Sequence, residues 1–196
     1  MKPVLLNLPE RIQTPRLLLR PPMPGDGPVV NAGVCASLEH LRPWMPWAKE
    51  KPSIEDSEEH ARRTYANWIL REDLGILIFL RETGEFLGGS GLHRINWNVP
   101  SVEIGYWIGQ AHEGKGYVTE TTLALTRLAF EKIGAHRVEI RCDPTNHRSA
   151  AVPKRLGFAY EGNLRNQIAG TDGSPRDTLV FSRTHADGLP PLDIEW

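Results

Sequence analysis

The sequence predicts one domain of mixed α/β class, in which strands and helices share a single core. The chain has 196 residues, which suits one domain with a full core. Apolar runs of strand length and helical patterns follow each other in the order β-α-α-β-β-β-α-β-α-β-β. No repeat, low-complexity tract or linker divides residues 1–196. We therefore expect a single domain with a core from about residue 14 to residue 184.

Composition and charge narrow the class of protein. The net charge of −1 argues against a general nucleic-acid binder. No apolar stretch approaches the ~20 residues of a membrane span, so we expect neither a membrane protein nor a nucleic-acid partner. The two cysteines, Cys35 and Cys142, lie far apart and lack the spacing of metal ligands. They are expected to be buried thiols in a reducing compartment, which favours a cytoplasmic protein without a metal site.

The first half of the chain is expected to supply three strands and two helical segments. Ser53 and Asp56 have the spacing of a capping box, which predicts that a helix starts there. Thr83 and Gly84 favour a hairpin turn between two strands. The expected segments are strand 14–20, a weak helix 24–41, an aromatic loop 41–47, a helix 53–69, and strands 75–80 and 85–95.

The second half begins with an apolar strand, Ser101–Ile108, followed by a glycine-rich turn and a helix of about 117–132 that Gly134 ends. The remaining expected elements are a strand 135–142, a short helix of about 146–156, and strands near 159–162 and 177–182. This brings the predicted sheet to about seven strands.

The glycine-rich turn before the second long helix is the most informative feature. Gly114 and Gly116 allow the backbone to approach a ligand closely and to expose consecutive N–H groups. The helix that follows directs its positive end to the same place, which favours phosphate binding. Three interpretations compete: a tight turn without a ligand, a nucleotide P-loop, and a cradle for the pyrophosphate of coenzyme A.

The P-loop interpretation fits the sequence poorly. The segment G-Q-A-H-E-G-K matches G-x-x-x-x-G-K, but Gly116 follows where magnesium coordination requires Ser or Thr. The strand before the turn also follows hairpin-linked strands, whereas a P-loop belongs to a βαβ arrangement.

The third interpretation comes with a family resemblance. A-H-E-G-K-G, residues 111–116, resembles the Q/R-x-x-G-x-G/A motif of the GNAT superfamily of acyl-CoA-dependent N-acyltransferases, with Ala111 as a departure. Four further segments occur in the order of that family's RimJ/RimL branch, which is named for acetyltransferases of ribosomal-protein N-termini. They are T-P-R-L-L-L-R, L-R-P-W-M-P-W, E-I-G-Y-W-I and N-H-R-S…L-G-F. The resemblance covers about residues 14–184.

The resemblance implies a fold and an activity. The GNAT fold has a mostly antiparallel sheet flanked by helices, with a V-shaped splay between its fourth and fifth strands, here Ser101–Ile108 and Arg137–Cys142. Acetyl-CoA would bind in that splay and give its acetyl group to a primary amine. A protein N-terminal α-amine is the expected acceptor. A small-molecule amine and a non-catalytic acyl-CoA sensor remain as alternatives, and a homodimer is left open.

The resemblance also implies cofactor-binding residues. The backbone of Trp107 and Ile108 would hold the pantetheine arm and face the thioester oxygen. Asn146 and Ser149 would contact the cofactor as well, although both residue types also suit plain helix capping. The glycine-rich turn would hold the pyrophosphate with residues His112, Glu113, Gly114, Lys115, Gly116 and Tyr117.

Two residues are candidates for catalysis. Glu103 stands where several GNAT enzymes carry a general base, and burial in a central strand would favour that role. A solvated strand carboxylate is the alternative. Ser149 matches a serine proposed in this branch to protonate the leaving thiolate. Pro153 occupies the place of the usual acid, a tyrosine, and should fall in the first turn of a helix beginning near residue 150. His93, His112 and His136 are expected to be surface or hydrogen-bonding histidines.

Overall fold

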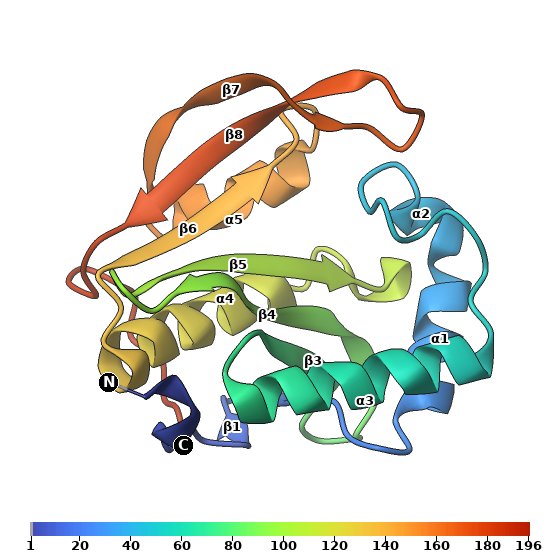
Figure 1. Cartoon of the computed structure of the whole chain (residues 1–196), viewed down its shortest axis with the longest axis horizontal. Helices are drawn as coiled ribbons and strands as arrows, with labels where there is room; N and C mark the ends of the chain where they lie inside the picture. The colour runs from blue at the N-terminus through green and yellow to red at the C-terminus, as the bar shows by residue number, and fades with distance from the viewer. Residues whose placement is uncertain (1) are drawn as a thin grey trace.

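The computed structural model describes residues 2–196 and contains an eight-stranded sheet in the order β1-β2-β3-β4-β5-β6-β8-β7 (Figure 1). All neighbouring strands pair antiparallel except β5 and β6. The strand beyond the predicted seven is β1, whose two residues are too few to show a pattern. The strands are β1 (Ile12–Gln13), β2 (Leu17–Arg20), β3 (Leu74–Leu80), β4 (Phe86–Asn96), β5 (Ser101–Ile108), β6 (Arg137–Cys142), β7 (Ala159–Ala169) and β8 (Pro175–Arg183).

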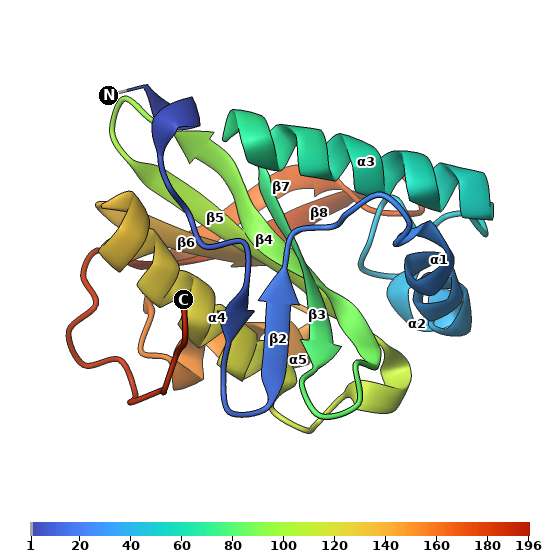
Figure 2. The same cartoon turned by 90° about the horizontal axis from the view of Figure 1, so that it is seen from below.

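Helices cover both faces of the sheet. Two long helices, α1 and α3, lie on one face, which we call the α1–α3 face, and α4 and α5 lie on the other (Figures 1 and 2). None of the helices in residues 2–196 is long and apolar enough to cross a membrane. The helices are α1 (Gly27–Ala36), α2 (Leu38–Leu41), α3 (Ile54–Leu70), α4 (Tyr117–Arg127) with a π-helical end (Leu128–Ile133), and α5 (His147–Arg155); 3₁₀ turns cover Pro3–Leu5 and Gln110–His112.

Strand β3 shows why the core has two layers. Its side chains alternate, and both sets are buried, as expected for a continuous apolar run at a sheet centre. Ile76 and Ile78 belong to the larger core under α4, whereas Leu77 and Phe79 pack with Val30 of α1 on the other face. The central strands are thereby fixed on both sides.

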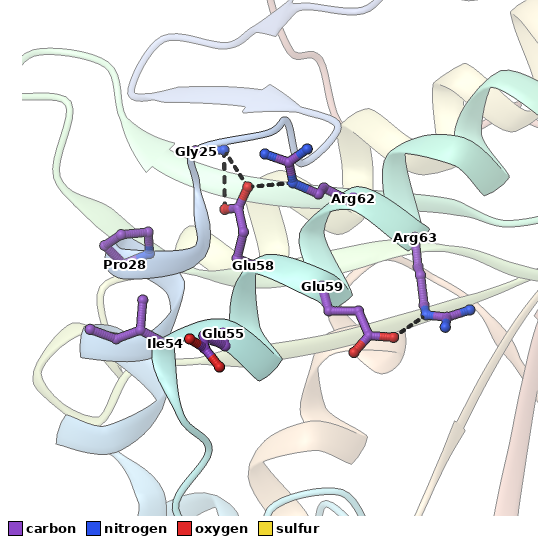
Figure 3. A pocket seen from close by; sticks show the side chains of 8 residues that line it. All are labelled: Gly25, Pro28, Ile54, Glu55, Glu58, Glu59, Arg62 and Arg63. Carbon is purple, nitrogen blue, oxygen red and sulfur yellow. Dashed lines mark hydrogen bonds and ion pairs between the residues drawn. The ribbon is translucent and has the colours of Figure 1, made fainter.

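The start of α3 joins the two helices of the α1–α3 face. The predicted capping box is confirmed, because Ser53 and Asp56 exchange backbone and side-chain hydrogen bonds. One turn later, the Glu58 carboxylate accepts a hydrogen bond from the backbone N–H group of Gly25 at 2.9 Å (Figure 3). It accepts another from the backbone N–H group of Gly27, also at 2.9 Å. A Cβ on Gly27 would lie 2.6 Å from Cβ of Glu58. Only glycine therefore permits this close approach of α1 to α3.

The short helix expected at about 146–156 is confirmed, but the later start that Pro153 suggested is wrong. Helix α5 begins at His147 and not near residue 150, so Pro153 lies inside the helix. Proline has no N–H group, and the carbonyl of Ser149 consequently lacks the donor that an α-helix would provide. The structure supplies another donor, which is described with the site.

The splay between β5 and β6 is confirmed. Their parallel pairing covers only three residue pairs and ends where Glu103 faces Glu139. Beyond these residues the strands diverge, as the arrangement of β5 and β6 in Figure 1 shows. The opening lies at the end of β5 that leads into the glycine-rich turn and α4.

Candidate active site

A cavity of about 780 Å³ connects the splay with the α1–α3 face. Its walls come from the aromatic loop before α3, from β4, β5 and the end of β6, from the start of α5, and from the β7–β8 hairpin. It brings together four residues that the sequence assigned to the site: Glu103, Trp107, Asn146 and Ser149. A second hollow, outside the junction of α1 and α3, is lined by the ion-paired Glu58 and Glu59 and contains none of them (Figure 3).

The glycine-rich turn has the backbone that the sequence predicts for an anion site. Gly114 and Gly116 adopt left-handed conformations, with φ of 72° and 80°. Gly116 is the N-cap of α4 and forms no side-chain capping bond, so the first N–H groups of the helix remain available to a ligand. A Cβ at Gly114 would meet no atom within 4 Å, which leaves the turn open on its outer side. These features fit a pyrophosphate group.

Arg16 braces this turn, a role that the sequence did not reveal. Its Nη1 donates to the carbonyl of Lys115 at 2.8 Å, and its Nε donates to Glu120 at 2.6 Å. Thr14 also donates to Glu120, at 2.6 Å. The guanidinium lies 4.8 Å from the ring centroid of Tyr117. The segment T-P-R-L-L-L-R thus supports the turn that carries the motif A-H-E-G-K-G.

Of the side chains that were predicted to bind the cofactor at the turn, two are engaged with other side chains and one is exposed. Glu113 is paired with Arg148 and with His40, whose Nε2 lies 3.0 Å from its Oε1. The His112 ring is largely covered and lies 3.6 Å from the Glu85 carboxylate, whereas Lys115 is exposed. A role for His112 and Glu113 in cofactor binding therefore rests on their backbone, and it remains a prediction.

Asn146, Ser149 and Tyr106 form a hydrogen-bonded group at the splay. The Oδ1 of Asn146 accepts from the N–H of Ser149 at 3.0 Å and so caps α5. The Ser149 hydroxyl donates to the Tyr106 oxygen at 3.2 Å, and the Tyr106 hydroxyl donates to the Ser149 carbonyl at 3.0 Å. This is the carbonyl that Pro153 leaves without its helical partner. Tyr106 was not predicted, because its partners lie 43 residues further along the chain.

Burial keeps the protons on the two acidic groups beside Ser149. Burial raises the pKa of the Tyr106 hydroxyl well above its ordinary value, and a hydrogen bond with Ser149 opposes this only in part. Burial likewise raises the pKa of the Cys142 thiol to about 11. Both groups are neutral near pH 7, so neither places a negative charge beside Ser149.

Glu103 is largely covered and ion-paired, with 17% of its side chain exposed. Its Oε2 accepts a hydrogen bond from Nη1 of Arg94 at 3.0 Å and lies 3.3 Å from Nε of Arg141. Arg141 also pairs with Glu139, which in turn pairs with Arg137. Glu103 thus belongs to a chain of ion pairs that crosses β4, β5 and β6.

The far wall of the cavity is aromatic, and a hydrogen bond links it to the β7–β8 hairpin. The Trp107 ring packs edge-to-face on Trp47 and Phe86, with centroid distances of 5.8 and 5.7 Å. Above them, Nη1 of Arg176 in β8 donates to the carbonyl of Pro43 at 3.0 Å and lies 3.3 Å from Asp143. The hairpin is thereby tied to the aromatic loop across the mouth of the cavity.

His93, which was expected to be a surface or hydrogen-bonding histidine, lines the cavity beside Glu103. Its Nδ1 lies 2.8 Å from Oδ2 of Asp73. The available signal was the glycine-rich run before it, G-G-S-G-L-H, which provides space for a ring. No group of three His, Cys, Asp or Glu side chains within residues 2–196 could hold a metal ion.

The sheet with its splay, the glycine-rich turn and the cavity between them define an acyl-CoA-dependent acetyltransferase. The sequence profile described as "Acetyltransferase (GNAT) domain" matches residues 16–159. The chain belongs to this family, and the predicted activity, acetyl transfer to an amine, is that of the family.

Individual relatives agree with the family. YdaF of Bacillus subtilis (strain 168), provisionally named a ribosomal N-acetyltransferase, is 33% identical over 165 residues, which cover 81% of this chain and 86% of YdaF. A provisionally assigned ribosomal-protein-serine acetyltransferase from Vibrio cholerae has a similar structure, with a TM-score of 0.76, 28% identity and coverage of 91% and 100%. RimL in complex with coenzyme A has the same fold, with a TM-score of 0.82, 22% identity and coverage of 91% and 98%.

Proposed function

We propose that this enzyme transfers the acetyl group of acetyl-CoA to the α-amine at the N-terminus of a protein or peptide. The observation that carries this proposal is the cavity, which joins the splay to a wide mouth between the aromatic loop and the β7–β8 hairpin. Its volume of about 780 Å³ is large enough for several residues of an extended chain.

The charge of the cavity suits an amine that arrives as a cation. Its lining contains the carboxylates of Glu50, Asp56, Asp73, Glu103 and Asp143, against the three guanidinium groups of Arg94, Arg141 and Arg176. Excess negative charge in a concave site attracts a cationic substrate and raises its local concentration. An α-amine also needs less help than a lysine to lose its proton, because its ordinary pKa lies near ~8 and not near ~10.4.

The names of the relatives point to the same acceptor. YdaF and the Vibrio cholerae protein are both named for ribosomal-protein acetylation, the latter for a serine. Acceptors of this kind would place the enzyme in the cytoplasm. The acceptor itself remains open to test, since the walls that would read a peptide come from the loop 41–52 and the hairpin.

Acetyl-CoA fits the residues at the splay. The N–H groups at Gly114 and Gly116 would hold its pyrophosphate, and the backbone of Trp107 and Ile108 would run along its pantetheine arm. Asn146 has a second possible use in addition to its cap, since its Nδ2 forms no hydrogen bond within residues 2–196. We assign to Ser149 the donation of a proton to the leaving thiolate, with Tyr106 holding its hydroxyl in place.

A panel of acceptors tests the proposal. Release of free coenzyme A is measured with peptides that begin with Ser, Ala or Met, with the same peptides blocked at the α-amine, and with small amines. We expect turnover with free α-amines and a mass increase of one acetyl group on the first residue. Turnover with small amines but with none of the peptides would show that the acceptor is a small-molecule amine and not a protein N-terminus. Tight binding of acetyl-CoA without any turnover would favour a sensor.

A further inference from the structure

We propose that His93, oriented by Asp73, is the general base that takes the proton from the acceptor amine, in place of Glu103. The inference depends on the proposed function only in that the acceptor is an amine. It holds for a peptide α-amine and for a small amine alike.

The pairing with Asp73 fixes which nitrogen of His93 is free. The carboxylate of Asp73, just before β3, lies 2.8 Å from Nδ1 of His93 in β4. An ionised carboxylate can only accept, so Nδ1 carries the proton and Nε2 of the neutral ring carries a lone pair. Nε2 forms no hydrogen bond with any of residues 2–196, and the side chain, which is among those that line the cavity, is 35% exposed. This is the arrangement of a base held by a second residue.

Two glycines on neighbouring strands make room for the ring. Gly91 of β4 and Gly105 of β5 face each other in the sheet. A Cβ at Gly91 would lie 2.7 Å from Cε1 and 2.8 Å from Nε2 of His93, and one at Gly105 would lie 3.1 Å from Cδ2 and 3.4 Å from Nε2. The imidazole therefore lies across both glycines, against the sheet. We call Gly91 and Gly105 the glycine floor.

The backbone next to His93 is irregular. The register of β4 against β5 shifts after His93, and the following residue, Arg94, has a left-handed φ of 49°. Such irregularities redirect side chains and are common beside active sites, where the surrounding structure sustains their cost. Here the shift sends Arg94 to Glu103 while His93 stays over the glycine floor.

His93 and the proton donors lie on opposite sides of the splay. Successive side chains of a strand point to opposite faces of its sheet. Gly105, under the His93 ring, is followed on β5 by Tyr106, whose hydroxyl reaches Ser149 on α5. A thioester in the splay would therefore have a proton acceptor on the α1–α3 face and proton donors on the α4–α5 face.

Glu103 is the cross-strand partner of His93 but is less suited to the task. Its Oε2 is occupied by Arg94 and Arg141. Proton transfer to this carboxylate would neutralise the partner of two guanidinium groups, whereas Nε2 of His93 has no such pairing to lose. Glu103 instead holds the two arginines beside the base.

The proposed step balances as follows. The cationic amine first loses one proton to solvent. The nitrogen of the neutral amine then attacks the thioester carbon, a C–N bond forms, and the electron pair of the C–S bond leaves with sulfur. The amine proton passes to Nε2 of His93, and the thiolate accepts the hydroxyl proton of Ser149. His93 then gives its proton to solvent, and solvent restores the proton of Ser149.

The test compares wild-type enzyme and variants at saturating acetyl-CoA, with the amine of the panel that wild type turns over fastest. His93→Gln should lower kcat about 100-fold or more, which is the usual size of a general-base contribution, and leave KM for acetyl-CoA unchanged. Its log kcat/KM should also fall less steeply with decreasing pH, because one ionisation is lost. Added imidazole should restore activity to His93→Ala. Asp73 contacts this ring directly, and the other titratable or charged groups that line the same cavity are Glu50, Asp56, His60, Arg94, Glu103, Tyr106, Arg141, Cys142, Asp143 and Arg176.

Three further variants separate the roles. Asp73→Asn should reduce kcat less than His93→Gln does and should not respond to imidazole, because it is a positioning residue. His185→Gln, at an exposed histidine, should retain wild-type rates. The proposal would be overturned if His93→Gln kept the wild-type kcat and the wild-type slope of log kcat/KM against pH. It would also be overturned if that slope changed in Glu103→Gln and not in His93→Gln.

A readout without turnover keeps the two proposals distinguishable. Nitrogen NMR of the coenzyme A complex reports the tautomer of His93 directly, and we expect the proton on Nδ1. A proton on Nε2 would refute the dyad even if peptides are acetylated. Failure of every peptide in the panel would instead refute the acceptor and leave the dyad intact.

Discussion

The Tyr106 hydroxyl donates a 3.0 Å hydrogen bond to the Ser149 carbonyl, and Pro153 is the reason why that carbonyl is free to accept it. A residue at position 153 with an N–H group would compete for the same oxygen. The substitution of the usual family tyrosine by proline thus couples a helix of the α4–α5 face to the strand that borders the splay.

This coupling can be measured with a double-mutant cycle. Tyr106→Phe leaves a buried carbonyl without a donor and should lower the free energy of unfolding by roughly 1–3 kcal/mol. In a Pro153→Ala background the same change should cost less, because the new N–H group can satisfy the carbonyl. Urea denaturation of the four proteins gives the coupling energy. Additive effects would show that Pro153 and Tyr106 do not share this carbonyl.

A substitution in the glycine-rich turn should weaken the use of acetyl-CoA in particular. Gly114→Ala forces a left-handed conformation on an L-residue, at a cost of roughly 1–2 kcal/mol, and should raise KM for acetyl-CoA. Gly134→Ala is the matched control, since Gly134 has a φ of 73° and also no atom within 4 Å of a Cβ. Both variants should lose similar stability in thermal unfolding. Equal KM values for the two would argue against a phosphate site at the turn.

The clasp between Arg176, Pro43 and Asp143 should affect the acceptor and not the cofactor. Arg176→Ala removes the link between hairpin and aromatic loop, so the acceptor walls lose their fixed spacing. We expect KM for the amine to rise by about threefold to tenfold, a loss of up to about 1.4 kcal/mol of binding free energy. Steady-state kinetics with each substrate varied in turn checks this. Arg63→Ala, at an exposed pair on α3, serves as control and should change neither KM.

One carboxylate should make stability depend on pH in the acid range. Hydrogen bonds from Arg137, and then from Ser182, lower the pKa of Glu161 from 4.5 to about 2. Because the folded state has the lower pKa, this stabilisation is complete above pH 4.5 and is lost as the pH falls towards 2. Glu161→Gln should therefore destabilise the protein at pH 7 more than at pH 3. Denaturant unfolding at both values tests this, with Glu59→Gln as the control at an exposed pair.

Elements with a strong local pattern were predictable, and those without one were not. The burial of β3 on both faces and the amphipathic α3 with its capping box follow from apolar spacing and end signals. Strand β7 was expected to end near residue 162 but runs to Ala169. It is an edge strand with nearly all side chains exposed, and so its sequence carries no apolar alternation.

In the site, likewise, features formed by neighbouring residues could be predicted, and features formed by distant residues could not. The turn at Gly114 and Gly116 is contiguous in sequence, so its phosphate-binding character could be inferred directly. The pair of Asp73 and His93 spans 20 residues, and Arg16 acts on a turn about 100 residues away. Such pairs depend on strand register and helix placement, which a single sequence does not reveal. The sheet brings them together.

The short pairing of β5 with β6 gives the sheet an internal edge. After Glu103 and Glu139 the two strands run on without a ladder between them. A free edge normally invites a further strand. Here only a slender molecule with amide groups of its own could fill the gap, and it would then act as a missing strand. Amide hydrogens of β5 should exchange more slowly once such a molecule is bound.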